Sequence, residues 1–278
     1  MYSITEKTVL NENVIRMTVH APLVARKALP GQFIIFRIDE NGERIPLTIA
    51  GYDRAAGTVT IIFQKVGYTT EKLALLNAGD SLLDFVGPLG EPSRTEGIKK
   101  AAVIGGGLGV AIAWPQAKAL KEARADVDLI VGFRNTDLII LENELHEACS
   151  ELTVMTDDGS NGNRGFVTQA LEQKLKAGVK YDEVIAIGPL PMMKAVSELT
   201  RPYGIKTVVS MNPIMIDGTG MCGGCRLTVG GETKFACVDG PDFDGHLVDF
   251  DEAIARSRMF REEERISREK HACRLIGG

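Results

Sequence analysis

Three cysteines in one glycine-rich segment are the residues best suited to chemistry in this chain of 278 residues. Cys222 and Cys225 form a C-x2-C pair, and Cys237 follows after eleven further residues, whereas Cys149 and Cys273 stand alone. In a reducing compartment, clustered thiols are more typical of a metal centre than of disulfides. The spacing suits a zinc site completed by a His, an Asp or a water, or an iron–sulfur cluster with a fourth ligand.

A glycine-rich turn between an apolar, strand-like run and a helix-like run is a second candidate site. Glycine permits a tight turn and lets a phosphate approach the backbone amides, while the helix N-terminus that follows favours negative charge. The turn lacks the spacing of G-x-G-x-x-G, and the missing G-K-[ST] argues against a Walker-type loop. An ordinary tight turn remains the alternative. The residues concerned are Gly105, Gly106, Gly107 and Gly109.

Other candidate ligand-binding residues follow neighbouring strand-like runs. Gly188 and Pro189 end the fourth run of the alternating region, Arg134 ends the second, and Asp157 and Asp158 follow the third. Ligands of open parallel sheets bind at the carboxyl ends of the strands. An arginine there can hold a phosphate or ribose, and an acid can bond a ribose 2′-hydroxyl and repel a 2′-phosphate, which favours NAD over NADP. Solvated loop charges are the alternative.

The elements that position these residues fall into three predicted regions. Residues 1–98 contain short β-branched runs separated by Gly, Pro, Asn and Asp, which predict a small antiparallel β-barrel with one helix near residues 69–80. Residues 99–211 alternate strand-like and helix-like runs, which predicts an α/β domain with a parallel sheet. Residues 212–278 form a small C-terminal region, whose charged tail (255–278) is either a solvated helix or a strap for a partner subunit.

Composition and charge narrow the class of protein. The chain is 44% hydrophobic and 25% charged, which is ordinary for a globular protein. Its net charge of −5 favours neither nucleic acid nor an anionic membrane. An uninterrupted apolar run of membrane-spanning length and a signal-peptide pattern are both missing, so the expected location is the cytoplasm. Cys149, within a helix-like run, is expected to be a buried small residue rather than a ligand.

The first region contains RIPLTI at residues 44–49, GYTT at 67–70 and GPLG at 87–90, all ahead of the glycine turn. In this order the three motifs resemble those of the ferredoxin reductase superfamily. The resemblance implies FAD, with Arg44 on the pyrophosphate and Thr48 facing the flavin ring as the catalytic residue. A guanidinium pairs with phosphate oxygens in a bidentate way, and a hydroxyl can exchange hydrogen bonds with the flavin. The first motif, at the end of a predicted strand, contributes Arg44, Pro46, Leu47, Thr48 and Ile49; the second contributes Gly67, Thr69 and Thr70; the third contributes Gly87 and Gly90.

The cysteine segment resembles the [2Fe–2S] region of the dihydroorotate dehydrogenase electron-transfer subunit, whose pattern is C-x4-C-x2-C-x(n)-C. Asp217 stands at the position of the first cysteine, and Cys222, Cys225 and Cys237 match the other three. This departure puts the fourth ligand and the dihydroorotate function in doubt. An Asp there resembles instead the small subunit of NADH-dependent reduced ferredoxin:NADP oxidoreductase, and the resemblance covers essentially the whole chain.

These resemblances imply an electron-transfer oxidoreductase subunit. It would hold FAD and one [2Fe–2S] cluster, exchange hydride with NAD(H), and exchange single electrons with a larger flavoprotein subunit that carries FAD and [4Fe–4S] clusters. The implied complex carries out flavin-based electron bifurcation. The nearest alternative is the dihydroorotate dehydrogenase electron-transfer subunit. Two others are a zinc-stabilised binding module with a regulatory nucleotide and a stand-alone NAD(P)H reductase.

Overall fold

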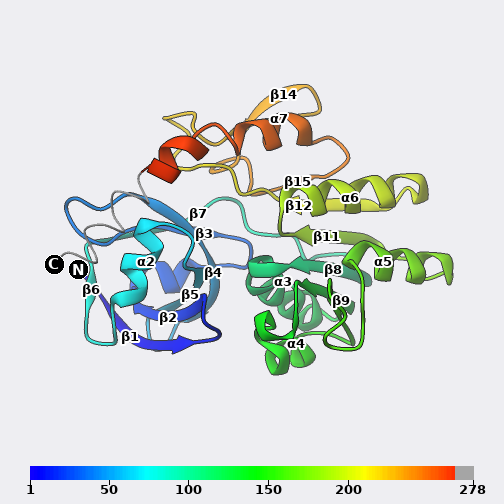
Figure 1. Ribbon diagram of the computed structural model, residues 1–278, viewed down its shortest axis with the longest axis horizontal. Coiled ribbons are helices and arrows are strands. Elements are labelled where there is room, and N and C mark those ends of the chain that lie inside the picture. Colours follow the sequence, from blue (N-terminus) through cyan, green and yellow to red (C-terminus); the bar gives the residue numbers. More distant parts are fainter. Residues whose placement is uncertain (267–278) are drawn as a thin grey trace.

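The structure is a computed structural model and describes residues 1–266. Cys273 and the end of the charged tail lie outside the described residues. Figure 1 shows a barrel, a parallel sheet flanked by helices, and a C-terminal segment that crosses above both. The predicted fold class is therefore confirmed: an antiparallel barrel precedes an α/β sheet, and a small C-terminal region follows.

The barrel is a seven-stranded antiparallel sheet with the order β6-β1-β2-β5-β4-β3-β7. Its two outermost strands, β6 and β7, are consecutive pieces of chain that meet at Leu83, so the sheet curls nearly closed and leaves little free edge. Met17, Ile61 and Phe63 are fully buried inside it. The strands are β1 (Tyr2–Val9), β2 (Val14–His20), β3 (Phe33–Arg37), β4 (Ile45–Asp53), β5 (Thr58–Gln64), β6 (Ser81–Leu82) and β7 (Asp84–Leu89).

Two short helices accompany the barrel. The expected helix is present as α2 (Tyr68–Leu75). The other, α1 (Pro22–Lys27), was not predicted. Proline at the first turn suits a helix start, and the buried Val24 and Ala25 hold the helix on the barrel. Six residues carry too little periodicity to be recognised without that packing.

The second sheet has the order β10-β9-β8-β11-β12-β15, and its first five strands are parallel. The strand order reverses between β8 and β11, which places a crevice at their carboxyl ends. The strands are β8 (Lys100–Gly106), β9 (Asp126–Phe133), β10 (Glu151–Thr156), β11 (Glu183–Ile187), β12 (Lys206–Ser210) and β15 (Asp242–Asp244). The helices are α3 (Val110–Glu122), α4 (Glu142–Ala148), α5 (Val167–Lys176) and α6 (Leu190–Thr200), with short 3-10 turns η1 (Gly107–Gly109), η2 (Thr136–Leu138) and η3 (Arg201–Tyr203).

The C-terminal region is not separate from the sheet. After a long loop it forms the hairpin of β13 (Arg226–Val229) and β14 (Glu232–Phe235), and then β15 and α7 (Phe250–Arg256). Strand β15 runs antiparallel to β12, so the sheet is mixed rather than purely parallel. Residues expected to form a third region thus complete the sheet of the second.

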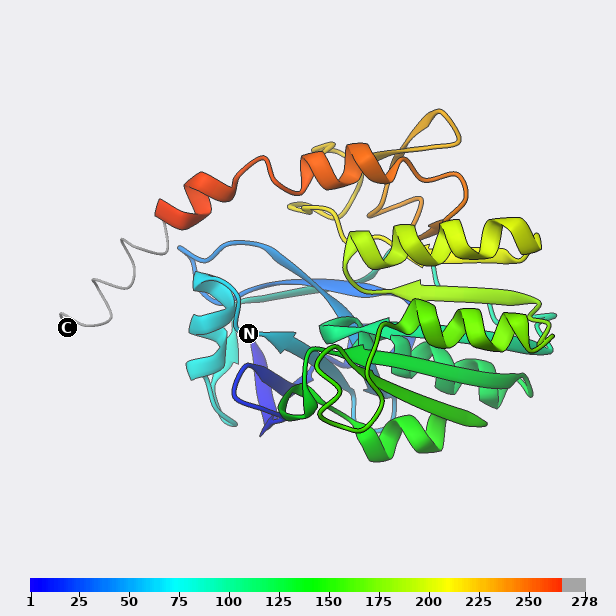
Figure 2. The ribbon, with the colours of Figure 1, turned by 45° about the vertical axis from the view of Figure 1, so that its right-hand side comes forward.

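Helices cover both faces of the second sheet. α3 and α4 pack with one buried core, and α5, α6 and α7 pack with the other. The barrel contacts the first core through Val14, Ala50 and Ile62 and the second through Phe33 and Ile35. Figure 2 shows the C-terminal segment still above the other two regions after the turn. No helix within residues 1–266 is long and apolar enough to cross a membrane.

Candidate functional site

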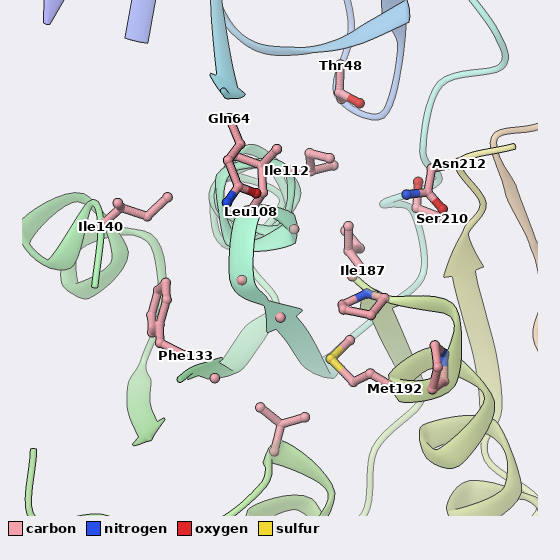
Figure 3. Close-up of a pocket in the computed structure, with 18 of the residues that line it drawn as sticks. Thr48, Gln64, Leu108, Ile112, Phe133, Ile140, Ile187, Met192, Ser210 and Asn212 are labelled. Carbon is pink, nitrogen blue, oxygen red and sulfur yellow. The ribbon is translucent and has the colours of Figure 1, made fainter. Parts of the chain in front are cut away.

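A cavity of about 990 Å³ lies where the barrel meets the carboxyl ends of the parallel strands. Its volume is at the upper end of the range for sites that bind organic cofactors. Figure 3 shows Thr48 at the top of the cavity, Ser210 and Asn212 below it on the same side of the view, and Ile187 and Met192 further down. Strand β4 carries the first of these residues, whereas the others lie on β11, on α6 and at or just beyond the end of β12.

The structure brings together about half of the predicted cofactor-binding residues along this one cavity. They come from the first flavin motif, the glycine turn and the ends of three parallel strands, which are far apart in sequence. Those that line it are Pro46, Thr48, Gly106, Gly107, Gly109, Arg134, Asp157, Gly188 and Pro189. Those that do not are Arg44, Leu47, Ile49, Gly67, Thr69, Thr70, Gly87, Gly90 and Gly105. Binding by either set stays a prediction.

Close packing explains two glycines of the turn. A Cβ on Gly109 would lie 2.3 Å from the carbonyl oxygen of Ile187, and one on Gly106 would lie 2.4 Å from the sulfur of Met192. The start of α3 therefore lies directly against the end of β11. A phosphate placed in the crevice would meet the backbone amides at the start of that helix.

Arg134 and Asp157 are exposed at the rim of the cavity. The neighbouring Asp158 does not line it; its carboxylate accepts a hydrogen bond from Ser160 N at 2.9 Å, which lowers its pKa. The exposed Asp158 thus has a local role in its loop. Arg134 and Asp157 line the cavity at the strand ends, where a nucleotide ribose or phosphate would lie.

Several lining residues were not singled out from the sequence. Ser210 ends the fifth parallel strand and Asn212 lies just beyond it, where ligands of open parallel sheets bind. Gln64 lies at the end of a barrel strand, and the exposed Phe166 precedes α5. Their sequence context carries no pattern beyond their position at the end of a strand or before a helix.

The barrel's first motif opens β4 instead of ending a strand, and its arginine lies outside the cavity. Arg44 donates from Nε to the carbonyl oxygen of Ile216 at 2.9 Å and from Nη2 to that of Asp217 at 3.4 Å. Its predicted pyrophosphate role stays a prediction, since the guanidinium is directed at the cysteine segment. Pro46 and Thr48, two and four residues further on, do line the cavity.

Residues of the second and third motifs bond or pack with neighbouring residues of the barrel region. Thr69 Oγ1 donates to Glu43, and Thr70 Oγ1 accepts from the amides of Val66 and Gly67 at 3.0 and 3.1 Å, which fixes the start of α2. Glycine is required at the third motif for packing. A Cβ on Gly87 would lie 2.7 Å from Ile34, and one on Gly90 would lie 2.8 Å from Phe33.

Asp242, on β15, is a half-buried acid that follows the cavity-lining Pro241, and its carboxylate oxygen Oδ1 is enclosed by protein. Ser93 Oγ donates to its Oδ2 at 2.5 Å, while Oδ1 has no hydrogen-bond partner among the described residues. Burial raises the pKa of this carboxyl. The two side-chain atoms Oε1 and Nε2 of Gln116, on α3, are likewise buried without a partner in that part of the chain. The Ser93 bond joins strand β15 to the segment that follows the barrel.

The predicted metal ligands lie in one loop and its neighbouring turn. Asp217 Oδ1 accepts from Thr219 N and Oδ2 accepts from Cys222 N, both at 2.8 Å, and the Thr219 bond is the main cause of its lowered pKa. Cys225 and Cys237 are both buried, and burial raises the pKa of Cys237 to about 12. Cys222 is exposed.

The donor set fits an iron–sulfur cluster better than a single metal ion. Within residues 1–266, no three His, Cys, Asp or Glu side chains are close enough together to hold one ion. Backbone amides already point at sulfur: Gly220 N donates to Cys237 Sγ at 3.2 Å, and Gly224 N donates to Cys222 Sγ at 3.5 Å. Such amide–sulfur bonds are typical of cluster sites, whose potential they tune. Cys149 is buried in the helical region, as expected.

Comparison with known proteins identifies two domains. The family described as the iron-sulfur cluster binding domain of dihydroorotate dehydrogenase B matches residues 212–249. The oxidoreductase NAD-binding domain matches residues 103–198. The first contains all four predicted ligands, and the second contains the glycine turn and the strand ends that line the cavity.

Relatives match nearly the whole chain. A Thermotoga maritima protein named dihydroorotate dehydrogenase B (NAD(+)), electron transfer subunit homolog, is 46% identical over 96% of this chain and 94% of its own. The electron transfer subunit of Geobacillus thermodenitrificans is 32% identical over 87% and 95%. A chain from the solved structure of NADH-dependent reduced ferredoxin-NADP oxidoreductase is 44% identical, with a TM-score of 0.92 and 98% of both chains covered.

The comparisons agree with the cofactors expected from the sequence: NAD(H), an iron–sulfur cluster and FAD. They also agree with an oxidoreductase that transfers electrons as part of a larger assembly. This chain is also similar to a chain of NADH-dependent reduced ferredoxin-NADP oxidoreductase. It belongs to the family of dihydroorotate dehydrogenase B electron transfer subunits and their homologues.

Proposed function

We propose that this chain is the NAD-side subunit of a bifurcating NADH-dependent reduced ferredoxin:NADP oxidoreductase. It exchanges hydride with NAD(H) in the cavity and single electrons with a larger flavoprotein subunit that carries FAD and [4Fe–4S] clusters. The observation that supports this most strongly is the cavity itself, where Thr48 of the barrel faces the strand ends of the NAD-binding domain. The relative at 44% identity comes from a structure described in terms of flavin-based electron bifurcation.

The cavity's own residues position the reactants. A bound FAD would supply the chemistry, because a flavin takes up hydride and releases electrons singly. Thr48 offers a hydroxyl to the flavin ring, and the amides of Gly107 and Gly109 offer donors to a phosphate. Arg134 and Asp157 at the rim would hold the phosphate and ribose of the nicotinamide nucleotide. Contact between the two rings, with water excluded, is the main contribution of the protein.

Asp217, Cys222, Cys225 and Cys237 would hold a [2Fe–2S] cluster. The last two are buried against the body of the protein, whereas Cys222 is exposed beside Met221, which is 88% exposed. One side of the loop therefore faces the barrel and the other faces outward, as a one-electron relay to a partner subunit requires. Clustered thiols must lose their protons to bind iron, so binding would reverse the raised pKa of Cys237.

The second candidate function is that of a dihydroorotate dehydrogenase electron transfer subunit. The family match over residues 212–249 and the relative at 32% identity favour it. Asp217 in place of the first cysteine argues against it. The two functions differ in the partner, which is a flavoprotein with [4Fe–4S] clusters in one case and an FMN enzyme in the other. Affinity purification of the tagged chain from its own organism, with assay of the co-purified subunit for FMN and for iron, distinguishes them.

The proposed cofactors are tested on protein purified without oxygen. We expect a flavin spectrum with additional broad absorbance and about two irons per chain. Asp217→Ala should lose iron and keep its flavin. Asp239→Ala is the matched control, because Asp239 also accepts a backbone hydrogen bond, from Phe235 N, in the same region. Zinc in place of iron would leave a reductase without a one-electron relay, and full iron content in Asp217→Ala would remove that residue from the ligand set.

A further inference from the structure

Arg44 is the barrel residue that reaches the cluster loop (residues 216–225). It lies 172 residues before Ile216 in sequence, yet its Nε donates to the Ile216 carbonyl oxygen at 2.9 Å. Its Nη2 donates to the carbonyl oxygen of Asp217 at 3.4 Å. The sequence motif indicated a phosphate ligand, so this contact was not expected. Nη1 has no hydrogen-bond partner within residues 1–266 and stays available to an anion.

The cluster loop depends on such contacts because it contains no helix or strand. Its internal hydrogen bonds, from the amides of Thr219 and Cys222 to the Asp217 carboxylate, fix its shape and not its position. The loop also lies against the barrel at Gly218, where a Cβ would lie 2.7 Å from both Ile35 and Leu89. That close approach to β3 and β7, and the Arg44 fork just before β4, attach the loop to the barrel.

The charge of Arg44 also bears on the cluster. A guanidinium remains protonated at all relevant pH values, and this one lies beside the backbone of the first proposed ligand. A fixed positive charge stabilises the reduced form of a neighbouring centre, because reduction adds a negative charge. A lysine at the position would keep the charge but could not make the two-pronged contact.

We propose, on the basis of the function above, that Arg44 is a positioning residue of the cluster. It holds the carbonyls of Ile216 and Asp217 against the barrel rim, and its charge raises the reduction potential of the cluster. The residue thereby connects the strand that carries Thr48 with the loop that carries Asp217, and it sets the separation between the hydride-transfer cavity and the one-electron relay.

The test compares Arg44→Ala and Arg44→Lys with Arg54→Ala in the full chain purified without oxygen. Arg54 is a matched control, because its Nε and Nη2 also donate to two backbone carbonyl oxygens, those of Arg26 and Ala28, at 3.3 and 3.0 Å within the barrel. The measurements are iron and flavin content, the electron paramagnetic resonance spectrum of the reduced cluster, and its midpoint potential from a redox titration.

We expect Arg44→Ala to shift the midpoint potential of the cluster to more negative values and to change its resonance spectrum. Arg44→Lys should retain most of the potential and still change the spectrum, and Arg54→Ala should match the wild type in both. If Arg44→Ala does not keep enough cluster for titration, the spectrum of Arg44→Lys decides. A wild-type spectrum and potential in the Arg44 variants, with or without loss of flavin, would overturn the inference. A wild-type protein without a cluster would instead refute the proposed function.

Discussion

The cavity and the cluster loop are built in different ways. The cavity's walls are strand ends and helix starts: Gly106 ends β8, Gly188 follows β11, and Thr48 lies within β4. The cluster loop has no regular structure, and its shape comes from turns at Gly218, Gly220 and Gly223, all with positive φ. Regular elements determine where the cavity residues lie, whereas a few side-chain and amide contacts determine where the loop lies.

The difference shows which part of each site is preorganised. The cavity forms from parallel strands whose backbone bonds are made in any case, so its shape does not depend on a bound cofactor. In the loop, backbone amides donate to the Asp217 carboxylate and to the Cys237 sulfur. The loop therefore orients its predicted ligand atoms through individual amide hydrogen bonds, whereas the cavity orients its residues through regular strands and helices.

The largest expected effect is loss of the cluster alone. Cys225→Ser replaces a buried thiol that is one of the predicted ligands, and hydroxyl oxygen is a poor ligand for an iron–sulfur cluster. Iron content should fall close to zero, while bound flavin and NADH affinity stay at wild-type values. Cys149→Ser is the control, because Cys149 is also buried but lies far from the loop in the helical region. Parallel loss of flavin in Cys225→Ser would show that the two sites are not independent.

A smaller effect is expected in the cavity from Gly109→Ala. The backbone of Gly109 is helical, so alanine causes no backbone strain there. The substitution is unfavourable because the new Cβ would lie 2.3 Å from the Ile187 carbonyl oxygen. Such overpacking costs about 1–3 kcal/mol of unfolding free energy, and it should weaken NADH binding while iron content is unchanged.

Thermal unfolding and an NADH titration provide the measurements for Gly109→Ala. Gly67→Ala serves as the control for stability, because its added Cβ has nothing within 4 Å and its φ of −160° is open to any residue. Equal stability and equal NADH affinity in Gly109→Ala and the wild type would show that the start of α3 can move away from β11.

The smallest effect is expected at Asp242, on β15. Burial raises the pKa of this carboxyl in the folded protein above its unfolded value. The folded state therefore binds more protons, and stability falls as pH rises from about 4 through the folded pKa. Asp242→Asn cannot ionise, so its unfolding temperature relative to the wild type should increase over the same rise in pH.

The control for Asp242 is expected to change in the opposite direction. Asp182 accepts hydrogen bonds from the amides of Lys99 and Lys100 at 2.8 and 2.9 Å, which lowers its pKa. The stability that Asp182 contributes is present above its unfolded pKa and is lost as pH falls. The unfolding temperature of Asp182→Asn relative to the wild type should therefore decrease as pH rises. Thermal unfolding of all three proteins between pH 2 and 8 measures this, because the contribution of Asp182 is lost below about pH 4 and the contribution of Asp242 changes above it. Parallel curves for Asp242→Asn and the wild type would contradict the first expectation.

Residue patterns within short segments of the sequence were sufficient to predict most of the fold. The alternation in residues 99–211 predicted a parallel sheet, and the spacing of Gly105 to Gly109 placed a tight turn between β8 and α3, as observed. Helix α1 was missed, because its six residues take their stability from packing against the barrel. Strand β15 was missed because three residues are too short for a periodic signal, and pairing with β12 defines it.

By itself, the sequence determined the order of the three regions, the glycine turn and the thiol spacing of the C-terminal loop, because these depend on residues close together in the chain. Only the tertiary structure decided that Ser210 and Asn212 line the same cavity as Thr48, and that Arg44 holds the backbone at Asp217. Contacts of this kind join residues more than 150 positions apart. They are set by how the barrel, the sheet and the loop pack together, and no local periodicity records that arrangement.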